Sequence, residues 1–365
     1  MHKIIMFFLL SSYLIFPFSV SSLSVSARNA VVMDIDSGRI LYSKAKDEPH
    51  LIASITKIMT CVLAIESGKT EDIVTIGEEV LTMYGSNIYL ELHEKMKLKD
   101  LLYGLMLRSG NDAAIVIATY IGSTEAKFVE QMNQKAKEIG MDNTIFTNSH
   151  GLDEKTKNYS TAHDMAKLSA YASKLPLYRE ISKTKKYTVA SETKTYIWHN
   201  RNDLLYSYKY ATGGKTGYTP KAGKTLVTTS NKNGLALTAV TLNDGNQYKT
   251  QIELYEDIYN KYDNYIILNK NKFKIDEAFY KDKIIIKNSF SYPLTSSEKD
   301  QIKILIQLTK LEKYKDNTIV GMAKVYLRDT LLKEEPIYVL KKEKVGIKYI
   351  ITSIYTWFTT VFNCN

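Results

Sequence analysis

Cysteine is scarce in this sequence. Only Cys61 and Cys364 occur in 365 residues, the first inside an apolar helical pattern and the second next to the C-terminus. Two cysteines placed in this way do not form the disulfide framework of a small secreted scaffold. We interpret Cys61 as an apolar residue of the core. The composition, 44% hydrophobic and 24% charged, is otherwise that of a globular protein.

Patterns typical of metal or nucleic-acid sites are also missing. The six histidines, His150 and His163 among them, do not cluster with the spacing of metal ligands, so we interpret them as structural and predict no metal and no cofactor. The net charge is +10, but the chain has no arginine-rich helix and no regular alternation of basic and aromatic residues. We therefore expect no nucleic-acid partner. The charge suits a polyanionic environment such as cell wall or anionic lipid.

The apolar run at the N-terminus is shorter than the roughly 20 residues that a bilayer span needs. It extends from Ile4 to Phe18 after Lys3, and Val25-Ser26-Ala27 then has the small-x-small pattern of a signal-peptidase site. We predict a signal peptide over residues 1–27, with an uncleaved N-terminal anchor as the alternative. Both interpretations place the protein outside the cytoplasm.

The length exceeds the roughly 250–300 residues at which single cores stop growing, so two domains are expected. Polar turns join apolar runs into two predicted hairpins, and helical periodicity marks at least three helices between them. Strands near both ends of this region imply one sheet closed by the two chain ends. The predicted strands are 29–34, 39–43, 225–230 and 235–242, and the predicted helices are 54–66, 98–107 and 112–121.

Beyond about residue 270 the pattern changes to short alternating runs, such as 283–286, 302–306 and 325–327. These runs are too short for helices and predict a small β domain over residues 269–342. Residues 345–362 then place polar side chains on one helical face and apolar ones on the rest. We predict that 343–365 is an amphipathic segment lying on the membrane surface. Packing on the protein's own core, or a strand, remains the alternative.

A serine three residues before a lysine occurs at five positions and selects nothing by itself; the serines are Ser43, Ser54, Ser182, Ser191 and Ser296. Ser54 differs because it begins an apolar helix. Residues three apart on a helix lie on the same face, so Lys57 can reach its hydroxyl. A helix N-terminus also offers free N–H groups to a developing oxyanion.

Two further motifs are unique in the chain and follow in order. Ser109-Gly110-Asn111 joins two predicted helices, and Lys215-Thr216-Gly217 precedes the second hairpin. Any of these residues alone could be a helix cap or an exposed strand charge. Together with Ser54 and Lys57 they form the known signature of β-lactamases and penicillin-binding proteins.

The chain resembles the low-molecular-mass penicillin-binding proteins that are serine-type D-Ala-D-Ala carboxypeptidases, the peptidase S11 family. The resemblance extends over nearly the whole chain after residue 28, and its blocks are 30–34, 53–60, 101–114, 150–152, 159–162 and 214–219. It implies an α+β fold: a β-lactamase-like catalytic domain over 28–268, with an antiparallel sheet and helices, then the small β domain and the amphipathic helix. The sequence departs from the expected pattern at Ser149 (proline expected), at 212–214 (Asp-Gly-Ile expected) and at Lys224 (cysteine expected).

The resemblance also implies roles for single residues. Ser54 would be the nucleophile and Lys57 its base, with a pKa lowered by burial and by the nearby Lys215. Ser109 would relay a proton to the leaving amine, and Asn111 would orient Lys57 and bind the substrate amide.

The remaining roles implied by the resemblance concern the substrate. Lys215 and Thr216 would hold the terminal carboxylate, and Gly217 would let the peptide lie along the strand edge. The N–H groups of Ser54 and Tyr218 would form the oxyanion hole.

The implied function is removal of the terminal D-alanine from peptidoglycan stem peptides ending in D-Ala-D-Ala, with β-lactams as covalent inhibitors. The implied location is the outer face of the bacterial cytoplasmic membrane or the cell-wall space. One alternative is a β-lactamase, but the Glu-x-x-Leu-Asn block that supplies the deacylating glutamate in the best-known class is absent. The other is a catalytically silent wall-binding protein on the same fold, against which the intact motif residues argue.

Overall fold

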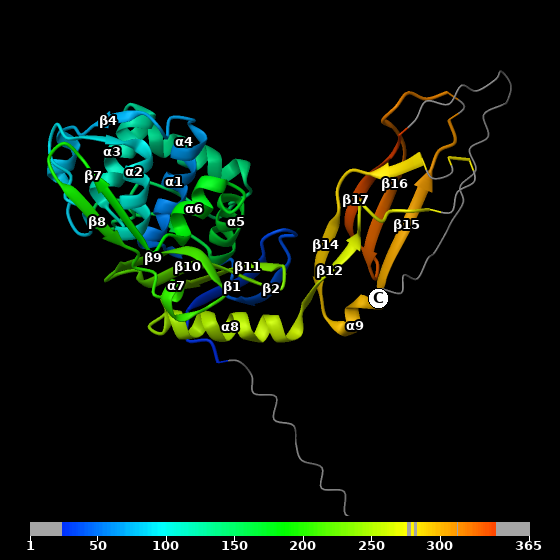
Figure 1. Cartoon of the computed structure of the whole chain (residues 1–365). Helices are drawn as coiled ribbons and strands as arrows, with labels where there is room; N and C mark the ends of the chain where they lie inside the picture. The colour runs from blue at the N-terminus through cyan, green and yellow to red at the C-terminus, as the bar shows by residue number, and fades with distance from the viewer. Residues whose placement is uncertain (1–23, 276–278, 281–282, 312, 341–365) are drawn as a thin grey trace, which may run out of the picture.

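The protein forms two lobes in the computed structural model, which describes residues 24–275, 279–280, 283–311 and 313–340 (Figure 1). The predicted leader, apart from residues 24–27, and the predicted amphipathic segment 343–365 lie outside the described residues. Within the described ranges, no helix has both the length and the apolar character needed to cross a membrane.

A five-stranded antiparallel sheet forms the centre of the first lobe, in the order β2-β1-β11-β10-β9. Its strands are β1 (Asn29–Asp34), β2 (Ile40–Lys44), β9 (Ala211–Thr219), β10 (Gly223–Lys232) and β11 (Leu235–Leu242). Both predicted hairpins are present, and β1 pairs with β11 so that Val31 lies opposite Val240. The prediction of one sheet closed by the two chain ends is therefore confirmed. Strand β9 lies at an edge of this sheet.

Helices cover both faces of this sheet (Figure 1). Helix α8 packs against β10 and β11 on one face, and the α1–α6 layer occupies the other, where α5 contacts β1 and β11. The bounds are α1 (Lys57–Glu66), α2 (Leu98–Tyr103), α3 (Asn111–Gly122), α4 (Glu125–Glu138), α5 (Ala162–Ala172), α6 (Pro176–Lys183), α7 (Leu204–Ser207) and α8 (Gln247–Lys261). Cys61 is completely buried in α1, as predicted.

Short two-stranded sheets and helical turns frame the helix layer. The strands are β3 (His50–Leu51), β4 (Ile73–Thr75), β5 (Lys95–Lys97), β6 (Tyr159–Ser160), β7 (Lys186–Ala190) and β8 (Thr195–His199), paired as β3-β6, β4-β5 and β7-β8. The turns are the 3₁₀ helices η1 (Ala53–Thr56) and η2 (Glu78–Thr82) and the π-helix η3 (Gly104–Arg108). The residues just before β1 also pack on this lobe. Ala27 is buried, and Ser26 Oγ donates a 2.6 Å hydrogen bond to Asp244.

The second lobe is a small β structure, as the alternating runs predicted. Four strands pair in the order β13-β17-β16-β15, and β12 pairs with β14. The bounds are β12 (Asp263–Leu268), β13 (Ile284–Ile286), β14 (Phe290–Leu294), β15 (Ile302–Leu308), β16 (Thr318–Leu327) and β17 (Thr330–Val339), with the short helix α9 (Ser296–Lys299). Since β12 pairs with β14, residues on both sides of position 268 belong to this lobe's sheets.

Arg39, in the turn between β1 and β2, joins the two lobes. Its guanidinium donates to Pro293 O at 2.5 Å and to Glu298 at 2.6 and 3.1 Å. It also lies over the rings of Tyr262 and Tyr292, 5.3 and 5.1 Å from their centres.

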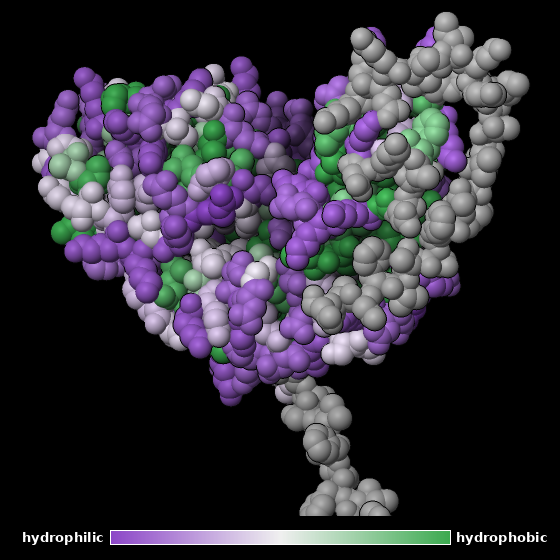
Figure 2. All heavy atoms as spheres, turned by 45° about the vertical axis from the view of Figure 1, so that its right-hand side comes forward, coloured by the Kyte–Doolittle hydropathy of each residue, from purple (hydrophilic) through white to green (hydrophobic). Residues whose placement is uncertain are grey.

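The face drawn in Figure 2 is largely hydrophilic, and its hydrophobic side chains gather mainly over the second lobe.

Candidate active site

Ser54 and Lys57 lie at the junction of η1 and α1. The predicted helix begins as a tight 3₁₀ turn over Ala53–Thr56 and becomes α-helical only at Lys57. This junction places Lys57 Nζ 3.1 Å from Ser54 Oγ. A lysine amine at this distance can take the hydroxyl proton if the amine is neutral.

The surroundings of Lys57 favour the neutral amine. The side chain is fully buried, and Nζ donates to Asn111 Oδ1 at 2.7 Å and to the His150 carbonyl at 2.5 Å. Burial, together with the charges of Lys215 and Arg201, holds the pKa of Lys57 well below its ordinary value, against the opposing charge of Asp112. Desolvation disfavours a cation, and neighbouring cations disfavour it further.

Ser109 occupies a left-handed backbone conformation between η3 and α3, with φ of 64°. The side chain is 4% exposed, and Ser109 Oγ has no hydrogen-bond partner within the described part of the chain. Buried hydroxyls are nearly always hydrogen-bonded, because an unpaired one costs about 1–3 kcal/mol. A group that arrives with a substrate could supply the missing partner.

Neither Asn111 nor Asp112 caps the following helix with its side chain. The N-cap position of α3 is Gly110, and no side chain caps the helix there. Asn111 is the first helical residue; its side chain bonds Lys57 and donates to Tyr84 O at 2.6 Å. The Asp112 carboxylate instead accepts the N–H of Ile88 at 3.0 Å and so fixes the loop beside the site.

Strand β9 brings the third motif to the same place. Lys215 is 1% exposed and donates to Thr216 O at 2.7 Å. Burial, and next the charge of Arg201, lower the pKa of Lys215 to about 7. Thr216 is half-buried, and the Tyr218 side chain is exposed.

Gly217 is the point where β9 approaches η1. A Cβ at this position would lie 2.9 Å from Ser54 N, closer than such atoms approach, and 3.1 Å from Ile55 N, which is unusually tight. Only a glycine therefore allows the strand edge to lie against the backbone that carries the Ser54 N–H. The structure thus brings all eight predicted site residues to one region, where β9, η1 and the η3–α3 junction meet.

Two groups near this region were not predicted. Arg201 follows β8; its N–H donates to Leu107 O at 3.1 Å and Nη1 donates to Ser86 Oγ at 2.8 Å. Its charge lowers the pKa of both buried lysines. His150, interpreted from the sequence only as structural, contributes its carbonyl to Lys57. Arg201 lies outside the blocks that carry the resemblance, and the block 150–152 does not reveal the role of the His150 carbonyl, since a backbone carbonyl carries no side-chain signal.

The described residues contain no group of three or more histidine, cysteine, aspartate or glutamate side chains arranged to hold a metal ion. The groups that the site presents are a serine hydroxyl, a lysine amine whose pKa is lowered, backbone N–H donors and a second buried lysine. This combination suits acyl transfer through a covalent serine ester.

Comparison with known proteins gives two family matches. Residues 17–246 match the family described as D-alanyl-D-alanine carboxypeptidase, and residues 262–345 match penicillin-binding protein 5, C-terminal domain. The chain is 38% identical over 226 residues to D-alanyl-D-alanine carboxypeptidase DacF of Bacillus subtilis, covering 60% of this chain and 58% of that protein. It is 37% identical over 227 residues to DacA of Haemophilus influenzae, covering 59% and 56%. The aligned region thus spans less than two thirds of these relatives.

Solved structures resemble both lobes. Penicillin binding protein 5 from Haemophilus influenzae matches with a TM-score of 0.73 and 26% identity, covering 88% of this chain and 99% of that one. Penicillin binding protein 6B from Escherichia coli matches with a TM-score of 0.69 and 27% identity, covering 88% and 97%. The two-lobed arrangement of a catalytic domain and a trailing β domain is therefore shared with these proteins.

Proposed function

This chain belongs to the D-alanyl-D-alanine carboxypeptidase family of serine peptidases, and from that premise we propose that it removes the terminal D-alanine from peptidoglycan stem peptides ending in D-Ala-D-Ala. The observation that carries the proposal is the 3.1 Å contact between Ser54 Oγ and the buried amine of Lys57. A hydroxyl next to a neutral amine is an activated nucleophile.

In the proposed acylation step, Ser54 Oγ attacks the carbonyl carbon of the penultimate D-alanine. Its proton passes to Lys57 Nζ, and the N–H groups of Ser54 and Tyr218 stabilise the oxyanion. The C–N bond then breaks, and the leaving amine of the terminal D-alanine receives a proton through Ser109. The unpaired Ser109 hydroxyl supports this role, because it has no competing partner among the described residues. Water hydrolyses the resulting ester, with Lys57 as the base.

Substrate binding would use the strand edge. We place the terminal carboxylate of the peptide at Lys215 and Thr216, since a carboxylate would stabilise the cationic form of the buried lysine. Gly217 leaves room for the peptide to pair with β9 as an additional strand. Strand β9 is suited to this pairing because it lies at the edge of the sheet. Asn111 would hold the substrate amide while it orients Lys57.

Labelled penicillin tests the nucleophile. A β-lactam presents a strained amide to the same groups, so the protein should form a covalent adduct that survives denaturation, and Ser54→Ala should abolish it. The control is Ser182→Ala, which removes the serine of another Ser-x-x-Lys match and should leave the adduct unchanged. An adduct that persists in Ser54→Ala would contradict the assignment.

Release of D-alanine from a pentapeptide ending in D-Ala-D-Ala separates the competing functions. A carboxypeptidase releases D-alanine and keeps its penicilloyl ester for a long time. A β-lactamase turns penicillin over rapidly and releases little D-alanine, and a silent wall-binding protein does neither. Absence of D-alanine release by a protein that forms the adduct would reject the carboxypeptidase function.

We further propose that residues 1–27 are an export signal, that the protein acts at the outer face of the cytoplasmic membrane, and that 343–365 binds the membrane surface. The pairing of β12 with β14 supports moving the domain boundary from 268/269 to about residue 262. Flotation with vesicles of anionic lipid tests the membrane segment: the full chain should float, and a chain ending at residue 340 should not.

A further inference from the structure

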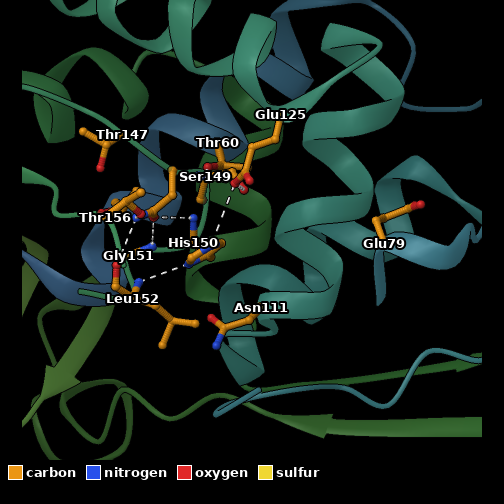
Figure 3. A network of polar contacts seen from close by, with 12 residues as sticks. Thr60, Glu79, Asn111, Glu125, Thr147, Ser149, His150, Gly151, Leu152 and Thr156 are labelled. Carbon is orange, nitrogen blue, oxygen red and sulfur yellow. Dashed lines mark hydrogen bonds and ion pairs between the residues drawn. The ribbon is translucent and has the colours of Figure 1, made fainter. Parts of the chain in front are cut away.

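The segment Thr147–Leu152, here called the His150 segment, lies across the first turn of α1, the helix that carries Lys57 (Figure 3). The Ser149 carbonyl accepts a 2.6 Å hydrogen bond from Thr60 in α1. The next carbonyl, that of His150, accepts from Lys57 Nζ at 2.5 Å. The position of this segment therefore determines one of the three hydrogen-bond contacts that orient the Lys57 amine.

Glu125 holds the His150 segment from the other side. It is the first residue of α4, and its Oε1 accepts from Ser149 N at 2.9 Å and from Ser149 Oγ at 2.7 Å. In Figure 3 its side chain points toward Ser149 and His150. A carboxylate that accepts two such hydrogen bonds restrains both the backbone and the side chain of the residue that it holds.

The His150 ring adds a weaker contact to this arrangement. His150 Nδ1 accepts from Leu152 N at 3.1 Å, so the hydrogen of the neutral ring is on Nε2, which faces Glu125 Oε1 at 3.8 Å. Burial, and next the charge of Lys57, lower the pKa of His150 to about 3. The ring is therefore neutral at physiological pH, and the contact with Glu125 is not an ion pair.

Ser149 stands where the family resemblance led us to expect proline. A proline fixes its own φ and has no N–H, so it could donate neither of the hydrogen bonds that Glu125 accepts. In this chain the segment lacks that covalent restraint. The two hydrogen bonds from Ser149 to Glu125 supply a restraint of a different kind.

We propose that Glu125 is a positioning residue for the Lys57 base, acting through Ser149 to fix the His150 carbonyl that orients the lysine amine toward Ser54. The inference rests on the proposed acylation of Ser54. It depends on hydrogen bonding and not on the charge of Glu125. The charged groups that face Lys57 and set its pKa are Lys215, Arg201 and Asp112. A neutral acceptor of the same length should therefore serve as well as the carboxylate.

The test compares Glu125→Ala with Glu125→Gln in the full chain, by the second-order rate of acylation with a fluorescent penicillin from pH 5 to pH 10. Glu125→Ala should lower the plateau rate about ten- to a hundredfold, the usual effect of a misplaced catalytic group. The rise of the rate with pH should also move to lower pH. A weaker hydrogen bond to the His150 carbonyl stabilises the protonated Lys57 amine less, and this lowers the pKa of Lys57. Glu125→Gln should keep both the rate and the profile.

Two further variants show whether the effect passes through Ser149. Ser149→Ala removes one of the two hydrogen bonds and should reduce the rate less than Glu125→Ala does. The variant that combines Glu125→Ala with Ser149→Ala should acylate no more slowly than Glu125→Ala alone, because both substitutions remove the same contact between Glu125 and Ser149. Glu130→Ala, at an exposed position of the same helix, is the matched control and should leave the rate and the profile unchanged.

The outcomes separate this inference from the proposed function. A wild-type protein that penicillin does not label would reject the acylation chemistry itself. A labelled wild type with an equally fast Glu125→Ala variant and an unmoved pH profile would overturn the positioning role alone. An equal loss in Glu125→Gln and Glu125→Ala would overturn the hydrogen-bond mechanism. Should Glu125→Ala not fold, a wild-type rate in Ser149→Ala would overturn the inference.

Discussion

Lys57 and Lys215 are buried close to one another, although lysine is among the residues that proteins bury least. Each loses the hydration of its ammonium group, and each pKa falls below the ordinary value of lysine. A buried cation without a carboxylate partner destabilises the folded state. The arrangement therefore lowers stability, but it favours the neutral form of the Lys57 amine and leaves the Lys215 amine without a carboxylate until an anion binds.

Replacing Lys215 with methionine should raise stability by about 1–4 kcal/mol near pH 7. The folded pKa of about 7 lies below the unfolded value, so the unfolded state binds more protons between these values and the stability of the wild type rises with pH. The advantage of Lys215→Met should shrink from pH 7 toward pH 10. Thermal unfolding at both pH values measures it, and Lys209→Met, at an exposed position, is the control. An advantage independent of pH would contradict the linkage.

Arg201→Gln should move the whole pH profile of D-alanine release to higher pH. Removal of this cation raises the pKa of Lys57, so the base becomes neutral at a higher pH, and raises the pKa of Lys215, so its cation persists to a higher pH. Both limbs of the kcat/KM profile therefore move in the same direction. A profile that stays in place would show that Arg201 does not act on these lysines.

The sequence predicted the members of the site well at the scale of single residues. Ser54 could be distinguished from four other serines by its helical context and by the two motifs downstream. Arg201 and the His150 carbonyl could not be predicted, because their contribution depends on where separate hairpins and loops meet in space. Asn111 and Asp112 are both residue types that favour helix caps, but their side chains have tertiary partners that outweigh this local preference.

At the scale of elements, the site depends on two tight junctions. At the first junction, strand β9 lies against η1 at Gly217. At the second, the helical stretch after β5 changes from α2 to the π-helix η3 and ends at Ser109, whose left-handed conformation changes the direction of the chain before α3. The sequence predicted one helix over 98–107 and an α-helix from Ser54. Periodicity predicts that a segment is helical, but over so few residues it cannot separate α, 3₁₀ and π turns, because the 3₁₀ and π turns each differ from the α turn by less than one residue.

Gly217→Ala should reduce penicillin acylation by at least about a hundredfold, the usual effect of removing one oxyanion donor. The added methyl group would enter the space beside Ser54 N, so β9 must retreat from η1. Stopped-flow acylation measures the loss. Gly245→Ala is the matched control, since its Cβ would meet nothing within 4 Å and neither Gly245 nor Gly217 has a positive φ. A normal rate in Gly217→Ala would mean that the strand can move without harm.

At the scale of the molecule, Arg39 links the two lobes. The sequence predicted a catalytic region followed by a small β domain, but it gave no sign of this contact, because Arg39 lies in a turn more than 200 residues away from Pro293 and Glu298. Its guanidinium combines a charge-assisted pair with two aromatic faces. The contact should restrain the angle between the lobes without reaching the active site.

Arg39→Ala should make the connection near residue 262 more sensitive to trypsin while penicillin acylation stays unchanged. The loss of the ion pair and of the aromatic contacts should weaken the association of the lobes by about 1–3 kcal/mol. Limited proteolysis and calorimetry measure the effect, with Arg328→Ala as the control because Arg328 bonds Gln301 within the second lobe. Unchanged cleavage would assign the restraint to other contacts.

The central sheet also has a consequence for how the protein is made. Strand β1 leaves the ribosome among the first residues of the domain, yet its partner β11 follows only after roughly two hundred more. Until then one edge of β1 remains open, and the nascent chain cannot assemble the sheet that carries β9. The catalytic domain is thus completed by its last strands, and a chain interrupted before residue 235 has an incomplete sheet, however many of the motif residues it already contains.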